Sequence, residues 1–221
     1  MKRRLAFLHA SPAAIAPLAA YYATNVPEYE ITNLLDDGLL RVFGAGDASG
    51  AQQRLARLLG YAIDNYGAEL ALVTCSAVSR ALVRELTSAA GIPAIKIDAP
   101  MAAKAVELGP RIGVIVTFPP TRPVTEALIR EVAEETKRPA DLDTRVVEEA
   151  YDALLTGNAE RHDELLLAAI SELAATRPGC IVLSQVSMAR VLSKLPPGHD
   201  VPVLTSLSTS LTAVRAALPG P

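Results

Sequence analysis

The feature that most constrains the fold of this chain is a strand–turn–helix pattern that occurs twice. The segment Arg4–Pro12 lines up with Arg111–Pro119, and Leu72–Arg80 lines up with Val182–Arg190. Both pairs are separated by roughly 110 residues, the kind of fixed spacing that marks an internal repeat. The identities are few, so the argument rests on the agreement between the two spacings. The sequence therefore predicts two similar halves.

Short apolar runs alternate with amphipathic runs along the whole chain. The expected strands are Leu5–His9, Glu30–Asn33, Leu70–Thr74, Ala94–Ile97, Arg111–Val116, Val146–Val147, Cys180–Leu183 and Val201–Leu204. The expected helices are Ala13–Asn25, Ala51–Tyr66, Ser76–Ala90, Met101–Leu108, Val124–Lys137, Glu160–Thr176 and Ser187–Lys194, with a last helix after Leu204. Alternation of this kind predicts parallel sheets with crossover helices, and the uniformly apolar strands predict burial on both faces.

These patterns predict an α/β protein with two pseudo-symmetric Rossmann-like lobes, each carrying a parallel sheet. We expect the N-terminal lobe to hold residues 1–98 and 206–221, and the C-terminal lobe to hold residues 99–205. Ligands of open α/β sheets bind at the carboxyl ends of the strands. The active site is therefore expected in the cleft between the lobes.

Composition excludes several classes of protein. The net charge is −3, Trp is absent and aromatic residues make up 4% of the chain, so neither nucleic acid nor an anionic membrane is an expected partner. Two cysteines are no disulfide framework, and the three histidines lack zinc-ligand spacing, so no metal site is expected. The apolar run Leu5–Ala10 is interrupted by His9, which favours a buried strand over a secretory signal. We expect a cytoplasmic protein without membrane spans.

The strongest candidate for chemistry is Cys75, where an apolar strand stops and a helix is expected to begin. A thiol at a helix N-terminus meets the positive end of the dipole and free N–H groups, which favour the thiolate. Those N–H groups, including that of Ala77, and the hydroxyls of Thr74 and Ser76 could hold a carboxylate. The alternative is a small cysteine buried at a strand end.

The second half carries Gln185 at the position that matches Cys75, framed by Ser184 and Ser187. An amide can donate and accept hydrogen bonds, but it cannot carry a proton on and off at neutral pH. Cys180 lies at the start of its strand, so we interpret it as a structural residue.

Hydroxyl side chains also follow the first strand of each half. Ser11 in the first half, and Thr117 and Thr121 in the second, could bind a substrate carboxylate, and helix capping by Ser11 and Thr121 is the simpler alternative. His9 could donate a proton or be satisfied by hydrogen bonds. We interpret Gly44–Gly50 as a mobile loop and the His162–Asp163 pair as a surface pair.

Taken together, these segments resemble the aspartate/glutamate/hydantoin racemase superfamily over nearly the whole chain. The matching segments are His9–Pro12, Leu35–Leu40, Val73–Ser76, Ile97–Met101, Arg111–Thr117 and Ile181–Met188. The resemblance implies two α/β lobes, no cofactor, and a pair of cysteines that flank the substrate α-carbon. Cys75 matches the first of those cysteines, whereas Gln185 stands where the second is expected, so this is a divergent member.

The resemblance implies a cofactor-independent isomerase or racemase-like enzyme that acts on a small carboxylic acid through the Cys75 thiolate. It also implies that Thr74, Ser76 and Ala77 hold the carboxylate, with Thr117, Thr121, Ser184 and Ser187 opposite. Two alternatives are a malonate-type decarboxylase with Cys75 as the proton donor, and a non-catalytic carboxylate-binding relative. Family members assemble as dimers or larger oligomers, which makes a homo-oligomer the expectation by analogy.

Overall fold

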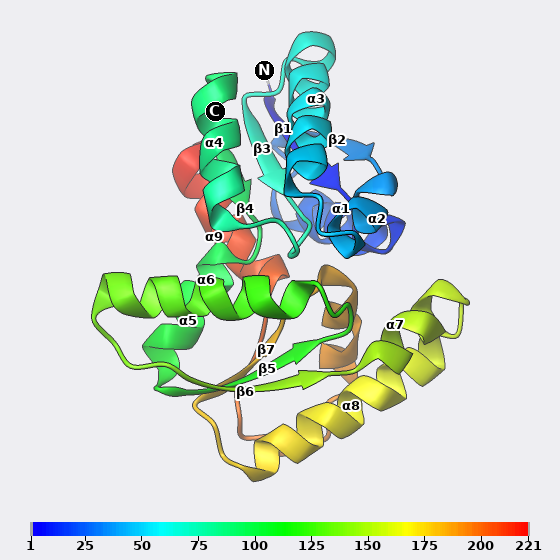
Figure 1. Ribbon diagram of the computed structural model, residues 1–221, viewed down its shortest axis with the longest axis vertical. Helices are drawn as coiled ribbons and strands as arrows, with labels where there is room; N and C mark the ends of the chain where they lie inside the picture. The colour runs from blue at the N-terminus through cyan, green and yellow to red at the C-terminus, as the bar shows by residue number, and fades with distance from the viewer. Residues whose placement is uncertain (1, 221) are drawn as a thin grey trace. The chain divides into compact units, whose positions relative to one another are not determined.

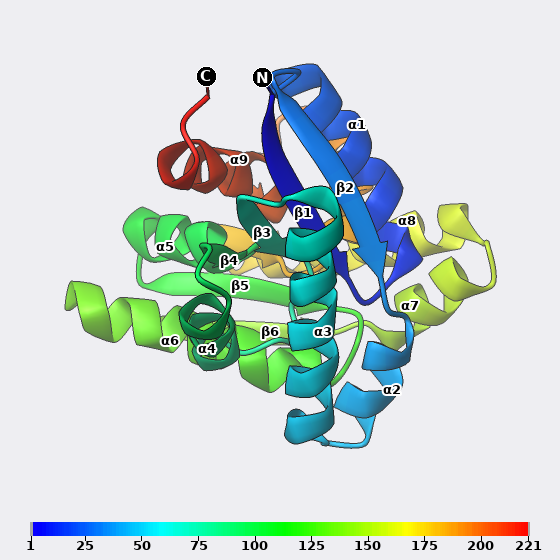
Figure 2. The ribbon, with the colours of Figure 1, turned by 90° about the horizontal axis from the view of Figure 1, so that it is seen from above.

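The computed structural model describes residues 2–220, and the chain divides into two compact units. Unit 1 holds Met1–Ala99 together with Leu207–Pro221, and unit 2 holds Pro100–Ser206. Each unit contains a four-stranded sheet with helices against it (Figures 1 and 2). Every strand pairing is parallel, which confirms the predicted α/β class with two parallel sheets.

The two sheets have the same strand order. In unit 1 the order is β2-β1-β3-β4, and in unit 2 it is β6-β5-β7-β8. The strands are β1 (Arg3–His9), β2 (Tyr29–Leu35), β3 (Leu70–Val73), β4 (Ala94–Lys96), β5 (Arg111–Val116), β6 (Asp141–Val146), β7 (Cys180–Leu183) and β8 (Val203–Thr205). Equivalent residues also pair alike, since Leu5 pairs with Leu70 and Ile112 pairs with Cys180. The internal repeat inferred from the spacing is therefore a structural repeat.

One face of the unit 1 sheet is covered by α3 (Ala48–Tyr66) and α4 (Arg80–Ala90), which lie beside each other in Figure 1. Alternate residues of β1 and β3 point to this face and pack against leucines of both helices. The residues that form this core include Ala6, Leu8, Ala71, Val73, Leu55, Leu59 and Leu86. All four residues of β3 are buried, as expected for a strand covered on both faces.

The opposite face of the same sheet meets α1 (Ile15–Asn25) and α9 (Ser206–Ala217). The Phe7 ring makes an edge contact with the Tyr22 ring at a centroid distance of 4.9 Å. The Tyr22 hydroxyl lies 3.0 Å from the Ser210 hydroxyl, and both residues are buried. The last helix therefore belongs to the core of unit 1, although it lies more than a hundred residues beyond β4 in the sequence.

Unit 2 repeats this arrangement with its own helices. They are α5 (Ala99–Leu108), α6 (Thr121–Thr136), α7 (Glu148–Leu155), α8 (Ala159–Ala175) and the 3₁₀ segment η2 (Val186–Lys194). Figure 1 shows α6 and α8 on opposite sides of the sheet. On the α8 side, Leu166, Ile170 and Leu173 pack against Ile115, Ile181 and Leu183.

The structure corrects several predicted boundaries. The helix expected at Ser76–Ala90 begins at Arg80, because Ser79 is the N-cap and its hydroxyl oxygen accepts a hydrogen bond from the Leu82 N–H at 3.1 Å. The segment Gly44–Gly50 is only partly a loop. It contains the end of a short helix, α2 (Gly38–Gly44), and the start of α3.

The early start of α3 has a clear cause. The Asp47 carboxylate accepts a hydrogen bond from the Gly50 N–H at 2.8 Å and caps the helix. At the other end Gly67 adopts φ 61°, a left-handed conformation that suits glycine and ends the helix. The N-terminal apolar run is strand β1, as predicted, and among the described residues no helix has the length and apolar character required to cross a bilayer.

Two leucines in unit 2 test this core. Leu173 is fully buried, whereas Leu155 is 62% exposed. We expect Leu173→Ala to lower the free energy of unfolding by about 2–5 kcal/mol, because it removes buried methyl groups and leaves a cavity. The matched control Leu155→Ala changes the same atoms at the surface and should cost less than about 0.5 kcal/mol. Urea unfolding followed by circular dichroism measures both values, and equal losses would contradict the assigned core.

Candidate functional site

The carboxyl edge of the unit 1 sheet brings His9 and Thr74 together. His9 ends β1, and Thr74 follows β3, its neighbour in the sheet. The Thr74 Oγ1 atom lies 2.9 Å from His9 Nδ1, and His9 Nε2 lies 3.0 Å from Asn33 Oδ1. Burial lowers the pKa of His9, and the Asn33 contact opposes this in part. The Thr74 hydroxyl donates its proton to the Leu8 carbonyl oxygen at 3.1 Å, so its oxygen faces His9 Nδ1 as an acceptor.

Because both ring nitrogens of His9 are engaged, the ring holds the strand ends in place. His9 is fully buried, and Thr74 is 6% exposed. The sequence left open whether His9 donates a proton or is satisfied by hydrogen bonds. The geometry of unit 1 favours the second alternative.

Cys75 lies in a turn between β3 and α4, four residues before the N-cap Ser79. Its backbone carbonyl accepts a hydrogen bond from the Val78 N–H at 3.2 Å, and the residue is partly exposed. Burial of the thiol raises its pKa to about 11, while the Ala77 N–H and the Lys96 charge oppose that rise. Burial therefore acts against the thiolate expected from the sequence, and α4 begins only at Arg80, so the thiolate stays a prediction.

A buried ion pair at the end of β4 contacts the Cys75 turn. The Lys96 ammonium lies 2.6 Å from one carboxylate oxygen of Asp98 and 2.8 Å from the other. It also donates a hydrogen bond to the Ser76 carbonyl oxygen at 3.2 Å. Burial raises the pKa of Asp98, and Lys96 offsets part of that rise. Neither residue was predicted as a site residue. The available signal was two charges at the end of the apolar run Ala94–Asp98.

Ser11 behaves as the capping alternative predicted. It is the N-cap of the 3₁₀ segment η1 (Pro12–Ala14), and its hydroxyl oxygen accepts from the Ala13 N–H at 3.3 Å. Ser76 and Ala77 are both nearly buried in the Cys75 turn. Thr74, Cys75, Ser76 and Ala77 thus form one compact group at the strand ends of unit 1.

In unit 2 the equivalent edge is built from neutral polar groups. The Ser184 hydroxyl donates to the Ile115 carbonyl oxygen at 2.7 Å. Gln185 Oε1 accepts a hydrogen bond from the Thr117 N–H at 3.2 Å. The Gln185 Nε2 atom is buried and has no hydrogen-bond partner within residues 2–220. Because the oxygen of this amide is held, its NH₂ group is oriented as a donor that lacks an acceptor.

The remaining predicted residues of unit 2 differ in accessibility. Thr121 is 1% exposed and is the first residue of α6, whose N-cap is Pro120 without a side-chain hydrogen bond. The predicted cap by Thr121 is therefore wrong. Ser187 lies on η2 and is half-buried. Cys180 is fully buried at the start of β7, with its Sγ atom 3.8 Å from the Ala105 carbonyl oxygen.

The pair His162–Asp163 lies in the interior of unit 2, so its interpretation as a surface pair is wrong. The side chain of Asp163 is 2% exposed, and one of its oxygens lies 2.9 Å from His162 Nδ1. Asp163 also accepts hydrogen bonds from Arg190 Nε at 3.1 Å and Lys194 Nζ at 2.7 Å. Both cations belong to η2, the segment that follows Gln185. The Asp163 carboxylate therefore holds η2 against α8.

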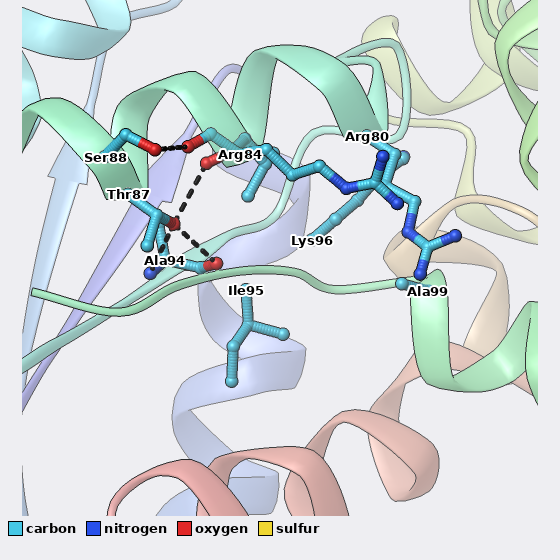
Figure 3. Close-up of a pocket in the computed structure, with 9 residues that line it drawn as sticks. Arg80, Arg84, Thr87, Ser88, Ala94, Ile95, Lys96 and Ala99 are labelled. Carbon is cyan, nitrogen blue, oxygen red and sulfur yellow. Dashed lines mark hydrogen bonds between the residues drawn. The ribbon is translucent and has the colours of Figure 1, made fainter.

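One hollow of unit 1 lies apart from the Cys75 turn. It has a volume of about 400 Å³ and lies between α4 and β4. Figure 3 shows Arg80, Arg84 and Lys96 around it, with the Thr87 hydroxyl accepting from the Ala94 N–H. Cys75 does not line this hollow. No group of three or more His, Cys, Asp or Glu side chains within residues 2–220 is arranged to hold a metal ion.

Comparison with known proteins agrees with this architecture. The family model described as Asp/Glu/Hydantoin racemase matches residues 18–214. An aspartate racemase homologue from Pyrococcus horikoshii OT3 superposes with a TM-score of 0.68 at 14% identity, covering 98% of this chain and 99% of its own. The glutamate racemase isoform RacE1 from Bacillus anthracis gives a TM-score of 0.73 at 15% identity, covering 97% and 82%.

Arylmalonate decarboxylase has the same fold, with a TM-score of 0.58 at 17% identity and coverage of 99% of this chain and 94% of its own. No curated protein sequence matches the chain.

The raised pKa of Cys75 predicts its reactivity. Only the thiolate attacks an alkylating agent, so the rate of carbamidomethylation at Cys75 should rise roughly tenfold per pH unit between about pH 7 and 10. The measurement is peptide mass spectrometry after timed exposure to iodoacetamide. A small free thiol is the control, since its curve levels off near an ordinary pKa of about 8.5. A Cys75 curve that levels off with the control would contradict the assigned environment.

Asp163 predicts a pH dependence of stability. Burial alone would raise the pKa of this carboxyl, but Lys194, His162 and Arg190 outweigh burial and lower it. The stabilisation is therefore complete above the unfolded carboxyl pKa of about 3.9 and is lost as the pH falls through the lower folded pKa. We expect Asp163→Asn to cost about 1–3 kcal/mol near pH 7.

The difference in free energy of unfolding between Asp163→Asn and wild type should stay constant down to about pH 5 and shrink below about pH 4. Urea unfolding at several pH values measures it. The exposed Asp152→Asn in the same unit is the matched control. A difference that stays constant down to pH 2 would contradict the role of the charged Asp163.

Proposed function

Because this chain belongs to the Asp/Glu/Hydantoin racemase family, we propose that it is a cofactor-independent enzyme that transfers a proton to the α-carbon of a small carboxylic acid. Cys75 is the proposed acid–base group. The observation that carries the proposal is the asymmetry between the two equivalent strand ends. Unit 1 has a thiol there, and unit 2 has the amide of Gln185.

The thiol is suited to donate a proton. With a pKa of about 11, Cys75 is protonated near pH 7 when no substrate is bound. A carbanion or enediolate next to a carboxylate is a strong base, so a protonated thiol close to it can deliver the proton. The resulting thiolate is stabilised by the Ala77 N–H and by Lys96, which both lower the pKa of the thiol.

Gln185 is the proposed binding group of the second unit. Its amide oxygen is held by the Thr117 N–H, and its Nε2 atom has no partner among the described residues. A carboxylate or enediolate oxygen is the kind of acceptor that would satisfy it. An amide cannot remove a proton, so this group binds substrate and does not replace a second base.

Decarboxylation of a malonate-type acid is the reaction that fits one protonated thiol best. Loss of carbon dioxide leaves the electron pair on the α-carbon, and the Cys75 proton then forms the new C–H bond. No base on the opposite face is needed. The likeness to arylmalonate decarboxylase concerns the fold alone, and it is compatible with this reaction.

A racemase or cis–trans isomerase reaction is the second candidate, and family membership is the observation that favours it. In this alternative Cys75 acts as the only base or nucleophile and must first lose its proton. The remaining predicted site residues are the proposed carboxylate ligands, namely Ser11, Thr74, Ser76, Ala77, Thr117, Thr121, Ser184 and Ser187. A shared cleft, a homo-oligomer and a cytoplasmic location stay predictions.

The test is proton NMR in D₂O with a panel of substituted malonates, amino acids, a hydantoin, 2-hydroxy acids and maleate. We expect wild-type protein to release carbon dioxide from a malonate and to place deuterium at the α-carbon of the product. Cys75→Ala should reduce this by about 10²–10⁴-fold, the usual contribution of general acid catalysis. The matched control is Cys180→Ala, which removes the other thiol and should retain activity.

Each remaining outcome decides between the alternatives. Exchange at the α-carbon of a substrate without loss of carbon dioxide would favour the racemase or isomerase reaction. Equal activity in wild type and Cys75→Ala would remove Cys75 from the mechanism. Thermal stabilisation by a carboxylate without any reaction would identify a binding protein.

A further inference from the structure

The Lys96–Asp98 pair is the most deeply buried pair of opposite charges that the structure describes in unit 1. Each side chain is 1% exposed. Charges removed from water are costly, so a buried ammonium requires strong partners, and Lys96 has three oxygen atoms within 3.2 Å. Two of these belong to Asp98, and the third is the backbone carbonyl oxygen of Ser76.

The contact with Ser76 determines how one peptide group is turned. In a planar trans peptide the C=O and the following N–H point in opposite directions. The Ser76 carbonyl points at the Lys96 ammonium, so the Ala77 N–H points away from it. The interaction of this N–H with the Cys75 thiol lowers the pKa of the thiol. Lys96 and the Cys75 thiol are therefore joined through a single rigid peptide.

We propose that Lys96 is a positioning residue that holds the Ser76–Ala77 peptide with its N–H on the Cys75 sulfur and places a positive charge beside the thiolate. Asp98 holds Lys96 in that position, and its negative charge offsets part of the effect of the Lys96 charge on the thiol. This inference rests on the proposed function for the role of the thiol in turnover. It concerns a property of Cys75 that can be measured without any substrate.

Lys96 and Asp98 are the charged groups that act on the thiol. The positive charge of Lys96 lowers the pKa of Cys75, and the negative charge of Asp98 raises it. Burial lowers the pKa of His9, which ends the neighbouring strand, and its contact with Asn33 opposes this in part. An electrostatic role therefore predicts opposite effects of removing the two charges, whereas a purely structural role predicts effects in the same direction.

The experiment measures carbamidomethylation of Cys75 by iodoacetamide from pH 6 to 11 in a Cys180→Ala background. We expect Lys96→Met to slow the reaction at pH 8 by at least about threefold, because the thiolate loses both the charge and the fixed N–H. We expect Asp98→Asn to accelerate it by at least about threefold, because the ammonium then acts unopposed. The rate curves should move to higher and lower pH respectively.

Two further variants keep the test decisive. Lys104→Met removes an exposed lysine that pairs with Glu107, and it should leave the curve unchanged. Lys96→Met combined with Asp98→Asn removes both charges while the shape is kept. It should shift the rate curve to higher pH by less than Lys96→Met alone. This double variant replaces the single variant in the test if Lys96→Met does not fold, as judged by circular dichroism.

The inference is overturned if the single variants leave the curve of folded protein unchanged or shift it in the same direction. Its failure is separate from that of the proposed function. Opposite shifts in alkylation together with no reaction of any acid would uphold the role of Lys96 and reject the catalytic role of Cys75. Unchanged alkylation together with Cys75-dependent release of carbon dioxide would give the reverse result.

Discussion

The pairing of β1 with β3 is the constraint on which the rest of unit 1 depends. Both strands are buried on two faces, so their polar ends are forced to the edge of the sheet. Because the strands are parallel, their carboxyl ends meet, and His9 comes to lie beside Thr74. The equivalent pairing of β5 with β7 does the same in unit 2 and brings the Thr117 N–H to Gln185.

One fold thus presents two strand-end sites of different chemistry. The strand ends of unit 1 carry a thiol, an imidazole and a buried ion pair, whereas those of unit 2 carry hydroxyls and an amide. The positions match closely, since Lys96 pairs with Val73 in one sheet and Thr205 pairs with Leu183 in the other. The two sheets share their strand order and register and differ in the groups at the strand ends that can hold charge or carry a proton.

Burial raises the pKa of the Cys75 thiol. A helix N-terminus lowers the pKa of a cysteine only when the thiol lies at the first turn, and the Ser79 cap moves that turn past Cys75. What remains to favour the thiolate is local, namely one peptide N–H and the Lys96 charge. In the proposed mechanism the resting thiol is an acid, which distinguishes proton delivery from the two-base chemistry that the resemblance implied.

The sequence by itself determined the class of fold, the repeat and the place of Cys75 at a strand end. Each of these follows from local apolar runs and from residue spacing, which are properties of neighbouring residues along the chain. Only the tertiary structure decided the raised pKa of the Cys75 thiol, the pairing of Lys96 with Asp98 and the burial of Asp163. The physical reason is that each depends on desolvation and on partners distant in sequence, such as the η2 cations around Asp163, and no local pattern records how far a charge will lie from water.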